Sequence, residues 1–523
     1  MGMVALAQRI ASAFVVFCGD WGAVSRQARA CHSSRQRIYR QAHHVQRRLE
    51  ETAWQQERQE LRAQLQRLGQ ENERLRQRLA QAVVLDADKQ AQFASAGQAQ
   101  GVSLPVLHRL LNLLQPGRAR RVAQLGRWSK QAGQKAARLL AVLDEAARPR
   151  VRQALADEVY VRDPVLMVVE PDSLCWLAGR KVARQELTGQ AWAEQLGALP
   201  ALEQVTCDAG PSLCRGVQEV NAQRRQAGRP ELAEQRDHFH ALRHGGRVVG
   251  GLEKRTRGAV KRAEELEGQL ARCRRDGRPL RGLSNRARAA WAKAERLMER
   301  WSHCARLWER VKQALPLVTP QGELNRRARA EAILAEVLPQ LPEAFAPSRN
   351  LLQQQEALTY LDRVHQRLQA LEAPPEVRAA AVRQETLRQR PELWRGEGPS
   401  AAALRGVLFA CATVLHLSGA VGQQVVEQVR SILRQAWRAS SLVECVNSVV
   451  RMQQARHRKL TQGLLDLKRL YWNTHAFRTG RRRGTSPYQR LGLPWPEALC
   501  WGELLKMPPE HLRQKLSAQG VAA

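Results

Sequence analysis

The chain has 523 residues, 44% of them hydrophobic, and Lys and Arg outnumber Asp and Glu by 84 to 49, a formal net charge of +35. That hydrophobic content excludes a fully disordered chain, and the length allows several domains. So large an excess of positive charge indicates a surface that meets a polyanion, in the first place a nucleic acid. The ten cysteines form no Cys-x-x-Cys pair, so we expect free thiols, a reducing cytoplasm and no zinc site.

A membrane surface is the alternative partner for so basic a chain. We find no run of about 18 apolar residues that would favour it. The apolar run at residues 11–18 follows Gln8 and Arg9. We interpret it as part of a first helix, and a signal peptide is the alternative.

Residues 1–46 are predicted to hold a helix-turn-helix between positions 20 and 44. Residues 30–32 form the expected turn, and Ser33 can cap the second helix. That helix carries three arginines, Arg35, Arg37 and Arg40. On an exposed helix they can contact phosphates or base edges in a major groove, so we expect them to bind DNA. The alternative is an ordinary helical pair with a solvated basic face.

Residues 47–85 are predicted to form a coiled coil. Apolar positions alternate spacings of four and three, with one Asn in the seam: Leu61, Leu65, Leu68, Asn72, Leu75 and Leu79. A buried Asn at such a position sets the register and favours a parallel pair. We therefore expect a homodimer through this segment. The alternative is a single long helix packed on its own protein.

Residues 86–150 are predicted to be a second helical DNA-binding region. Positions 87–114 repeat the helix-turn-helix pattern, with Pro105 at the start of the second helix. Four leucines are expected to form the core face of that helix, namely Leu107, Leu110, Leu111 and Leu114. A basic helix is expected to follow and to run to about residue 147.

Residues 151–240 change in texture, because short β-rich runs replace the helical pattern. Strands are expected at 154–161, 165–169, 174–177 and 202–207, with a last one ending at 236–240, and a helix at 190–199. The order is three strands, a helix, a strand, a helix and a strand. We expect a ribonuclease H-like α/β domain in a chain that is otherwise mostly α.

Residues 241–438 lose the strand signals and are predicted to be a long, all-helical insertion. The most apolar stretch, 407–417, is expected to be a buried helix. The insertion is rich in basic pairs and carries Trp291, Trp301, Trp308 and Trp394. An exposed indole can stack on an unpaired base, whereas a buried one fills a core between helices. Both interpretations stay open.

Three carboxylates are the candidate catalytic and metal-binding residues: Asp157 in the first strand, Asp208 at the end of the fourth and Glu444 on a late helix. Hard oxygen ligands from separate elements can hold two Mg²⁺ ions for phosphoryl transfer. The first and fourth strands are neighbours in this fold, so Asp157 and Asp208 can converge. Asp172 competes with Asp157, but the sequence around it predicts a turn.

The segment 439–495 has further polar groups. Asn447 and Arg451 follow Glu444 at helical spacings of three and seven. Residues that we expect to grip DNA phosphates are Arg451, Lys459, Arg481, Arg482 and Arg483. His240, in Asp237-His238-Phe239-His240, can touch a scissile phosphate, or can simply end a strand. Residues 496–523 are taken as a C-terminal tail.

Taken in order, these motifs resemble the DDE transposases that bacterial insertion sequences encode. The similarity covers roughly residues 85–495 and is carried by Ala156-Asp157-Glu158-Val159-Tyr160, Cys207-Asp208-Ala209-Gly210, Asp237-His238-Phe239-His240 and the segment around Glu444. The Tyr-Arg-Glu-Lys spacing of one subgroup is absent. The resemblance implies a ribonuclease H-like core with a helical insertion and a triad of Asp157, Asp208 and Glu444.

The resemblance also implies an activity and partners. The protein would bind the terminal inverted repeats of its element, cut DNA with two Mg²⁺ ions, for which Mn²⁺ can substitute, and join the freed 3′-hydroxyl to target DNA. It would be a bacterial, cytoplasmic, nucleoid-associated protein. The sequence contains no Gly-x-x-x-x-Gly-Lys loop, so a nucleotide cofactor is not implied. The alternatives are a non-catalytic dimeric DNA-binding regulator or inactive relic, and a structure-specific nuclease of the same fold.

Overall fold

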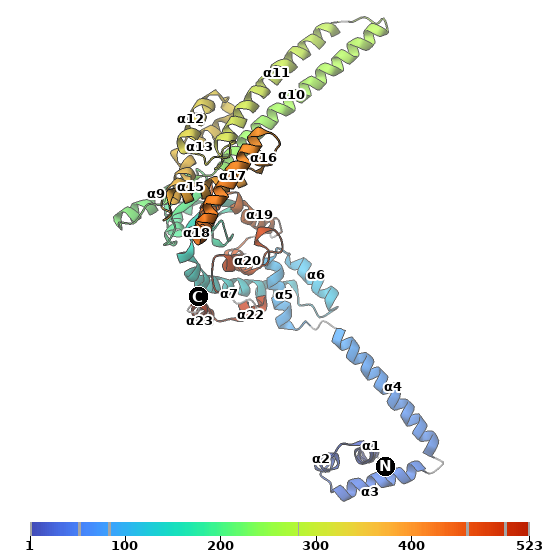
Figure 1. Ribbon diagram of the computed structural model, residues 1–523. Helices are drawn as coiled ribbons and strands as arrows, with labels where there is room; N and C mark the ends of the chain where they lie inside the picture. The colour runs from blue at the N-terminus through green and yellow to red at the C-terminus, as the bar shows by residue number, and fades with distance from the viewer. Residues whose placement is uncertain are drawn as a thin grey trace. The chain divides into compact units, whose positions relative to one another are not determined.

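The computed structural model describes residues 3–50, 54–81, 85–280, 282–456, 460–495 and 499–520. It is mostly helical, with one five-stranded sheet (Figure 1). The chain divides into two compact units, Met1–Leu85 and Asp86–Ala523. This agrees with the predicted class of a mostly α chain with one α/β region.

The first unit contains four helices: α1 (Met3–Cys18), α2 (Ala23–Ala30), α3 (Arg35–Glu50) and α4 (Trp54–Gln81). Helices α2 and α3 lie where the sequence predicts a helical pair. Ala28, Ile38 and Ala42 are buried between the first three helices. Arg35, Arg37 and Arg40 are exposed on α3, as a surface that meets DNA requires.

Helix α4 leaves its leucine seam uncovered within this unit. Leu61 is 37% exposed, Leu65 66%, Leu68 62% and Leu75 55%. Asn72 is exposed between them, and the side chain of Leu79 lies outside the described part of the chain. The seam is therefore not buried against α1–α3, which favours pairing with a second copy over packing on its own unit.

A peptide of residues 47–85 is expected to form a parallel dimer, because the leucine seam has no other cover in its own unit. Asn72→Leu should raise the stability of the helix and loosen the choice of oligomer, since the buried amide that specifies pairing is lost. Thermal unfolding followed by circular dichroism measures the stability, and sedimentation measures the oligomeric state. A peptide that stays monomeric at tens of micromolar would count against the dimer.

The second unit begins with α5 (Ala87–Ala99), α6 (Leu104–Leu114) and α7 (Val122–Ala147). The carboxylate of Asp86 caps α5 by accepting from Lys89 N at 2.7 Å. Leu107 and Leu111 are buried on α6 as predicted, but Leu110 and Leu114 are 39% and 50% exposed. The predicted core face is therefore too wide by two residues, because α6 packs along a single narrow stripe.

The sheet has β1 (Gln153–Val161), β2 (Asp163–Val169), β3 (Trp176–Lys181), β4 (Gln204–Cys207) and β5 (Ala233–Arg236). Its order is β3-β2-β1-β4-β5, with β1 antiparallel to β2 and parallel to β4. Helices α8 (Gly189–Gly197) and α9 (Pro211–Gln226) connect β3 to β4 and β4 to β5. The predicted element order is correct. The third strand lies further along than 174–177, and the fifth ends at Arg236 because the next residue caps a helix.

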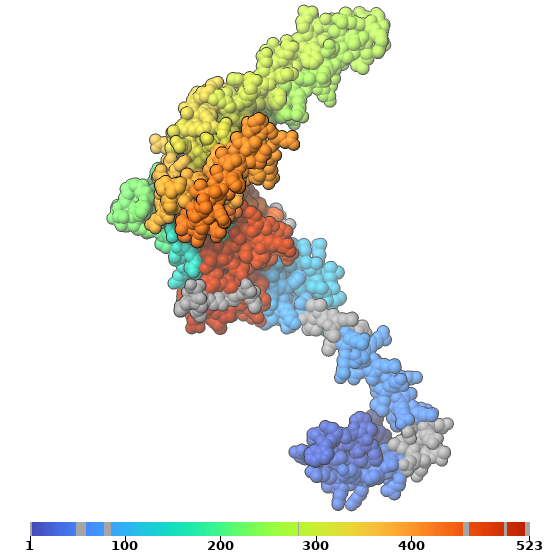
Figure 2. Space-filling view, in the orientation of Figure 1, coloured from blue at the N-terminus to red at the C-terminus, as the bar shows by residue number. Residues whose placement is uncertain are grey.

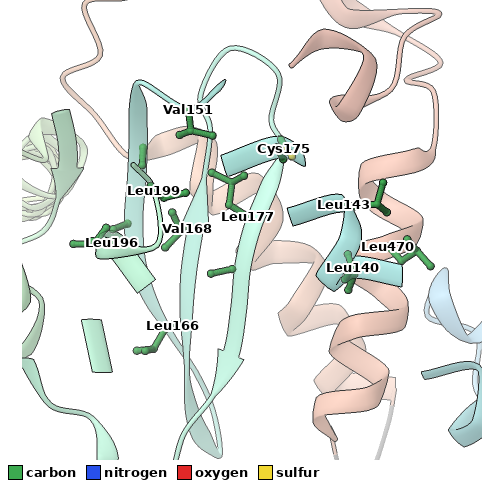
Figure 3. Close-up of a cluster of buried hydrophobic side chains, with 14 of the residues drawn as sticks. Leu140, Leu143, Val151, Leu166, Val168, Cys175, Leu177, Leu196, Leu199 and Leu470 are labelled. Carbon is green, nitrogen blue, oxygen red and sulfur yellow. The ribbon is translucent and has the colours of Figure 1, made fainter. Parts of the chain in front are cut away.

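Alternating side chains of the sheet pack into two cores. One face, with Leu166 and Val168, packs against α7, α8 and α20 (Gln462–Thr474); the close-up in Figure 3 shows Leu140, Leu143 and Leu470 from these helices. The other face, with Leu155, Val159 and Met167, packs against Val443 and Val446 of α19 (Ser441–Arg456). Asp157 falls in the second set of positions, so it faces α19.

Helices fill the long segment between β5 and α19. They are α10 (His238–Arg275), α11 (Leu283–Ala314), α12 (Arg327–Val337), α13 (Ala346–Leu352), α14 (Thr359–Gln369), α15 (Pro375–Arg388), α16 (Pro391–Arg395), α17 (Pro399–Leu417) and α18 (Gly419–Arg434). The sequence predicts a helical segment here, and the structure has one.

One sequence expectation about α17 is wrong. The stretch 407–417 is not a buried helix, since Phe409 is 76% and Leu417 80% exposed, and only Ala401, Cys411 and Leu415 of α17 are buried. Among the described residues, α17 is the one helix long and apolar enough to cross a membrane, a test that core helices also pass. Composition alone cannot tell which of these environments an apolar helix occupies.

The four tryptophans of the insertion are engaged in packing. Trp308 is 3% exposed and lies 5.5 Å, between ring centroids, from Phe345. Trp301 packs against the same core. The indole N–H of Trp291 donates to Glu267, and that of Trp394 to the carbonyl of Leu387. These contacts favour the helix-packing interpretation over base stacking.

Candidate functional site

Asp157 and Asp208 lie next to each other across two neighbouring parallel strands. Ala156 of β1 is the cross-strand partner of Cys207, the last residue of β4. Asp157 is the next residue of β1, and Asp208 directly follows the end of β4. Asp157 is 6% exposed and Asp208 is half-buried. The adjacency that the sequence predicts between these two acids is therefore present.

Helix α19 brings Glu444 to the same place. Val443, Val446 and Val450 hold its apolar face against β1 and β2. Asn447, fully buried on α19, donates from Nδ2 to Asp157 Oδ2 at 2.6 Å. Glu444 is one turn earlier and accepts from Arg451 Nη1 at 2.8 Å. The predicted face of Glu444, Asn447 and Arg451 thus meets the first strand.

The buried carboxylate of Asp157 feels the charges of the other two acids. Burial, together with the carboxylates of Asp208 and Glu444, raises the pKa of Asp157 to about 7, against a hydrogen bond from Glu158 N at 2.8 Å. Burial also raises the pKa of Asp208, while a hydrogen bond from Gly210 N at 3.1 Å opposes the rise. Facing carboxylates disfavour ionisation in the absence of a cation.

Asp237 is a site residue that the sequence analysis did not identify. It is fully buried at the N-terminus of α10, where Oδ1 accepts from Phe239 N at 2.7 Å and from Ser440 N at 3.0 Å. Its Oδ2 accepts from the Ser440 hydroxyl. Burial alone would raise the pKa of Asp237, but hydrogen bonds from His240 and Ser440 hold it below its usual value. Asp237 therefore joins the end of β5 to the start of α19.

His240 lies between this aspartate and the acids. Its Nδ1 is 2.6 Å from Asp237 Oδ2. The hydrogen bond to Asp237 raises the pKa of His240, and the charges of Asp157 and Asp208 raise it further. The sequence motif placed His240 at a strand end. The structure instead places it in the first turn of α10, held beside the two aspartates.

The other residues that the sequence predicts to grip DNA phosphates differ in their exposure. Arg481 and Arg483 are exposed, as DNA contact requires, and Lys459 lies outside the described residues. Arg482 is half-buried and donates from Nε to Asp172 O and from Nη2 to Pro171 O, both at 2.9 Å. It therefore ties down the turn between β2 and β3, which is a role in folding.

Asp172 lies in that same turn, as expected. Met167 is the cross-strand partner of Asp157, and Asp172 follows Met167 by five residues, beyond the end of β2. The backbone N–H of Asp172 donates to Glu170 Oε1 at 3.0 Å. Strand position therefore separates Asp172 from Asp208 and favours Asp157 as the first acid.

The donor set suits a hard divalent cation. In the described ranges, no three His, Cys, Asp or Glu side chains are grouped closely enough to form a ready-made metal site. The three carboxylates nevertheless supply oxygen ligands of the kind that Mg²⁺ prefers. The buried Asn447 Oδ1, next to Asp157, has no hydrogen-bond partner within the described part of the chain. A cation between the acids would relieve the repulsion that raises the pKa of Asp157, so the residues fit such an ion.

Comparisons with known proteins add no relative. No family model, no curated protein and no solved structure matches the chain.

Proposed function

We propose that the protein is a DDE-type transposase that binds the ends of its own element and cuts and joins DNA with divalent cations. The observation that carries the proposal is the placement of Asp157 and Asp208 side by side on β1 and at the end of β4, with Glu444 on α19, the helix whose Asn447 holds Asp157. The strand order β3-β2-β1-β4-β5, with a helical segment between β5 and α19, supports a ribonuclease H-like core. The net charge of +35 supports a DNA substrate.

The proposed chemistry assigns a task to each side chain. Asp157, Asp208 and Glu444 would hold two Mg²⁺ ions, which when bound activate water and neutralise charge on the phosphate. Asn447 keeps the carboxylate of Asp157 oriented through its hydrogen bond. Asp237 raises the pKa of His240 and so favours its charged form, which can donate a hydrogen bond to a non-bridging oxygen of the scissile phosphate. Arg451 can exchange its ion pair with Glu444 for a contact with a phosphate of the DNA backbone.

A cleavage assay on the DNA that flanks the gene tests this function. The parent protein is expected to nick end-labelled inverted repeats in Mg²⁺ or Mn²⁺, to leave a 3′-hydroxyl, and to join that end to a plasmid. Binding without nicking would instead indicate a dimeric regulator. Nicking without joining would indicate a nuclease of the same fold.

DNA binding should weaken steeply with salt, because the charge is expected to be used on phosphates. Each neutralised phosphate contributes about 0.9 to the slope of log K against log salt. Fluorescence anisotropy with the full-length protein at several salt concentrations gives this slope. A slope shallower than about −3, equivalent to fewer than about four contacts, would mean that the charge is not used on DNA.

The α2–α3 pair is expected to read the ends. Replacing Arg35, Arg37 and Arg40 together by Gln should weaken binding to the inverted repeats by at least about tenfold, since each arginine in a groove contributes about 1–3 kcal/mol. Thermal unfolding should not change, because all three side chains are exposed. Unchanged binding would assign this pair of helices to assembly.

A further inference from the structure

The antiparallel pair of α10 and α11 concentrates positive charge. Residues 238–314 carry 20 Lys and Arg against 8 Asp and Glu. Figure 1 shows the two helices side by side, joined by a short connection at their far end. Leu266, Leu270, Leu283 and Ala287 pack between them there. This firm packing gives the charged side chains a fixed backbone.

Figure 2 shows the α10–α11 pair in yellow-green. A groove runs between the two helices on one side of the pair. Its volume is about 470 Å³. Arg255, Arg262 and Lys293 supply its charge, and no acidic residue lines it. Its other lining residues have small or aliphatic side chains: Gly258, Ala259, Ala290 and Leu297. The groove is therefore positively charged, and small or aliphatic side chains form its floor.

The protein neutralises the three cations only weakly. In the part of the chain that the structure describes, Arg255 and Lys293 have no ion pair, and Arg262 has one exposed contact at 3.3 Å with Glu265. An exposed pair at that distance is worth little and is readily exchanged. The groove thus holds like charges close together, which an anion would stabilise.

The spacing fits an extended polyanion better than a single small anion. Arg255 and Arg262 lie seven residues apart on α10, about 10 Å along the helix at 1.5 Å per residue. One DNA strand carries a phosphate every 3.4 Å or so of helix axis, so about three phosphates span that distance. Gly258 lies midway, and a Cβ added there would meet no atom within 4 Å. A sugar-phosphate backbone can therefore approach the floor closely.

We propose that this groove binds the DNA backbone, contacting successive phosphates through Arg255, Arg262 and Lys293 without reading sequence. The inference rests on the proposed function and names a surface for it that is made of residues other than the carboxylates and the arginines of α3. Because phosphate contacts carry no sequence information, the groove adds affinity equally for any duplex.

The test compares two full-length variants of equal charge. The groove variant is Arg255→Gln, Arg262→Gln and Lys293→Gln. The control is Arg286→Gln, Arg288→Gln and Lys261→Gln, three exposed cations of the same two helices that do not line the groove. The groove variant should reduce the salt slope by about 2 to 3, at about 0.9 for each lost contact, and the control by less than about 1. The loss should be the same on element ends and on unrelated duplex DNA.

A second variant keeps the charge and changes only the shape. Gly258→Leu should fill the floor of the groove, and it has open space and a better helix propensity than glycine. It should weaken duplex binding at least about threefold while the melting temperature stays level or rises. Equal salt slopes in the groove and control variants, or unchanged binding by Gly258→Leu, would overturn the proposed role of the groove and leave the proposed function standing. A parent protein that fails to bind DNA would overturn the proposed function as well.

Discussion

Replacing any one of Asp157, Asp208 and Glu444 by alanine should abolish Mg²⁺-dependent cleavage and leave binding to the element ends nearly intact. Each side chain would be a ligand for a cation that stabilises the attacking and leaving oxygens, and such stabilisation is worth several kcal/mol. A loss of about 4 kcal/mol corresponds to about a thousandfold in rate. Binding should survive, because the arginines of α3 and the carboxylates belong to different units of the chain. Single-turnover cleavage and anisotropy, run on the same preparations, measure the two effects.

Asp172→Ala is the matched control for these variants. Asp172 is an acid of the same sheet, in the turn between β2 and β3, and losing it should cost about 1 kcal/mol of stability and no chemistry. If Asp172→Ala stopped cleavage in a folded protein and Asp157→Ala did not, the first acid would be assigned to the wrong strand position.

Asp157→Asn should stabilise the metal-free protein at high pH. The folded-state pKa of Asp157 is about 7, against an ordinary value of 3.8. The unfolded chain therefore gives up this proton at lower pH than the folded chain, and stability falls as the pH rises from about 4 to 7. At 1.36 kcal/mol per pKa unit, the full penalty above pH 7 is roughly 4 kcal/mol at most.

Denaturation at pH 5 and pH 8, with and without Mg²⁺, measures this effect. Asparagine keeps the shape and can still accept from Asn447, although it loses the acceptor for Glu158 N. The gain over the parent should be larger at pH 8 than at pH 5, and Mg²⁺ should narrow it by stabilising the parent alone. A destabilised variant at pH 8 would show that Asp157 is not under electrostatic strain.

The local sequence pattern was sufficient to predict the residues of the candidate site that lie on strands and helices. Strand periodicity and the small residues after Asp208 indicated the two aspartates, and helical spacing placed Asn447 and Arg451 on the face of Glu444. Long-range contacts were out of reach. Asp237 gains its role from Ser440, which lies 203 residues later, and Arg482 from carbonyls of a turn 310 residues earlier. Such partners depend on tertiary packing, which neither periodicity nor composition encodes.

The same limit explains the errors outside the site. The apolar composition of α17 predicted burial, but composition does not reveal which neighbours a helix has, and Phe409 and Leu417 remain exposed. On α6 the apolar stripe is wider than the contact it makes. The third strand was predicted too early because Leu174, with φ of 60°, belongs to the turn, a left-handed conformation that its side chain does not favour.

Cleavage of end DNA by the parent and by Glu444→Gln, side by side in Mg²⁺ and in EDTA, tests the central claim most directly. Glutamine keeps the size of the side chain and nearly the same helix propensity, and removes only the charge. The parent should produce nicks with a 3′-hydroxyl in Mg²⁺ and none in EDTA, and the variant should bind the same DNA and produce none in either. Equal nicking by both proteins, or nicking by the parent in EDTA, would contradict the account.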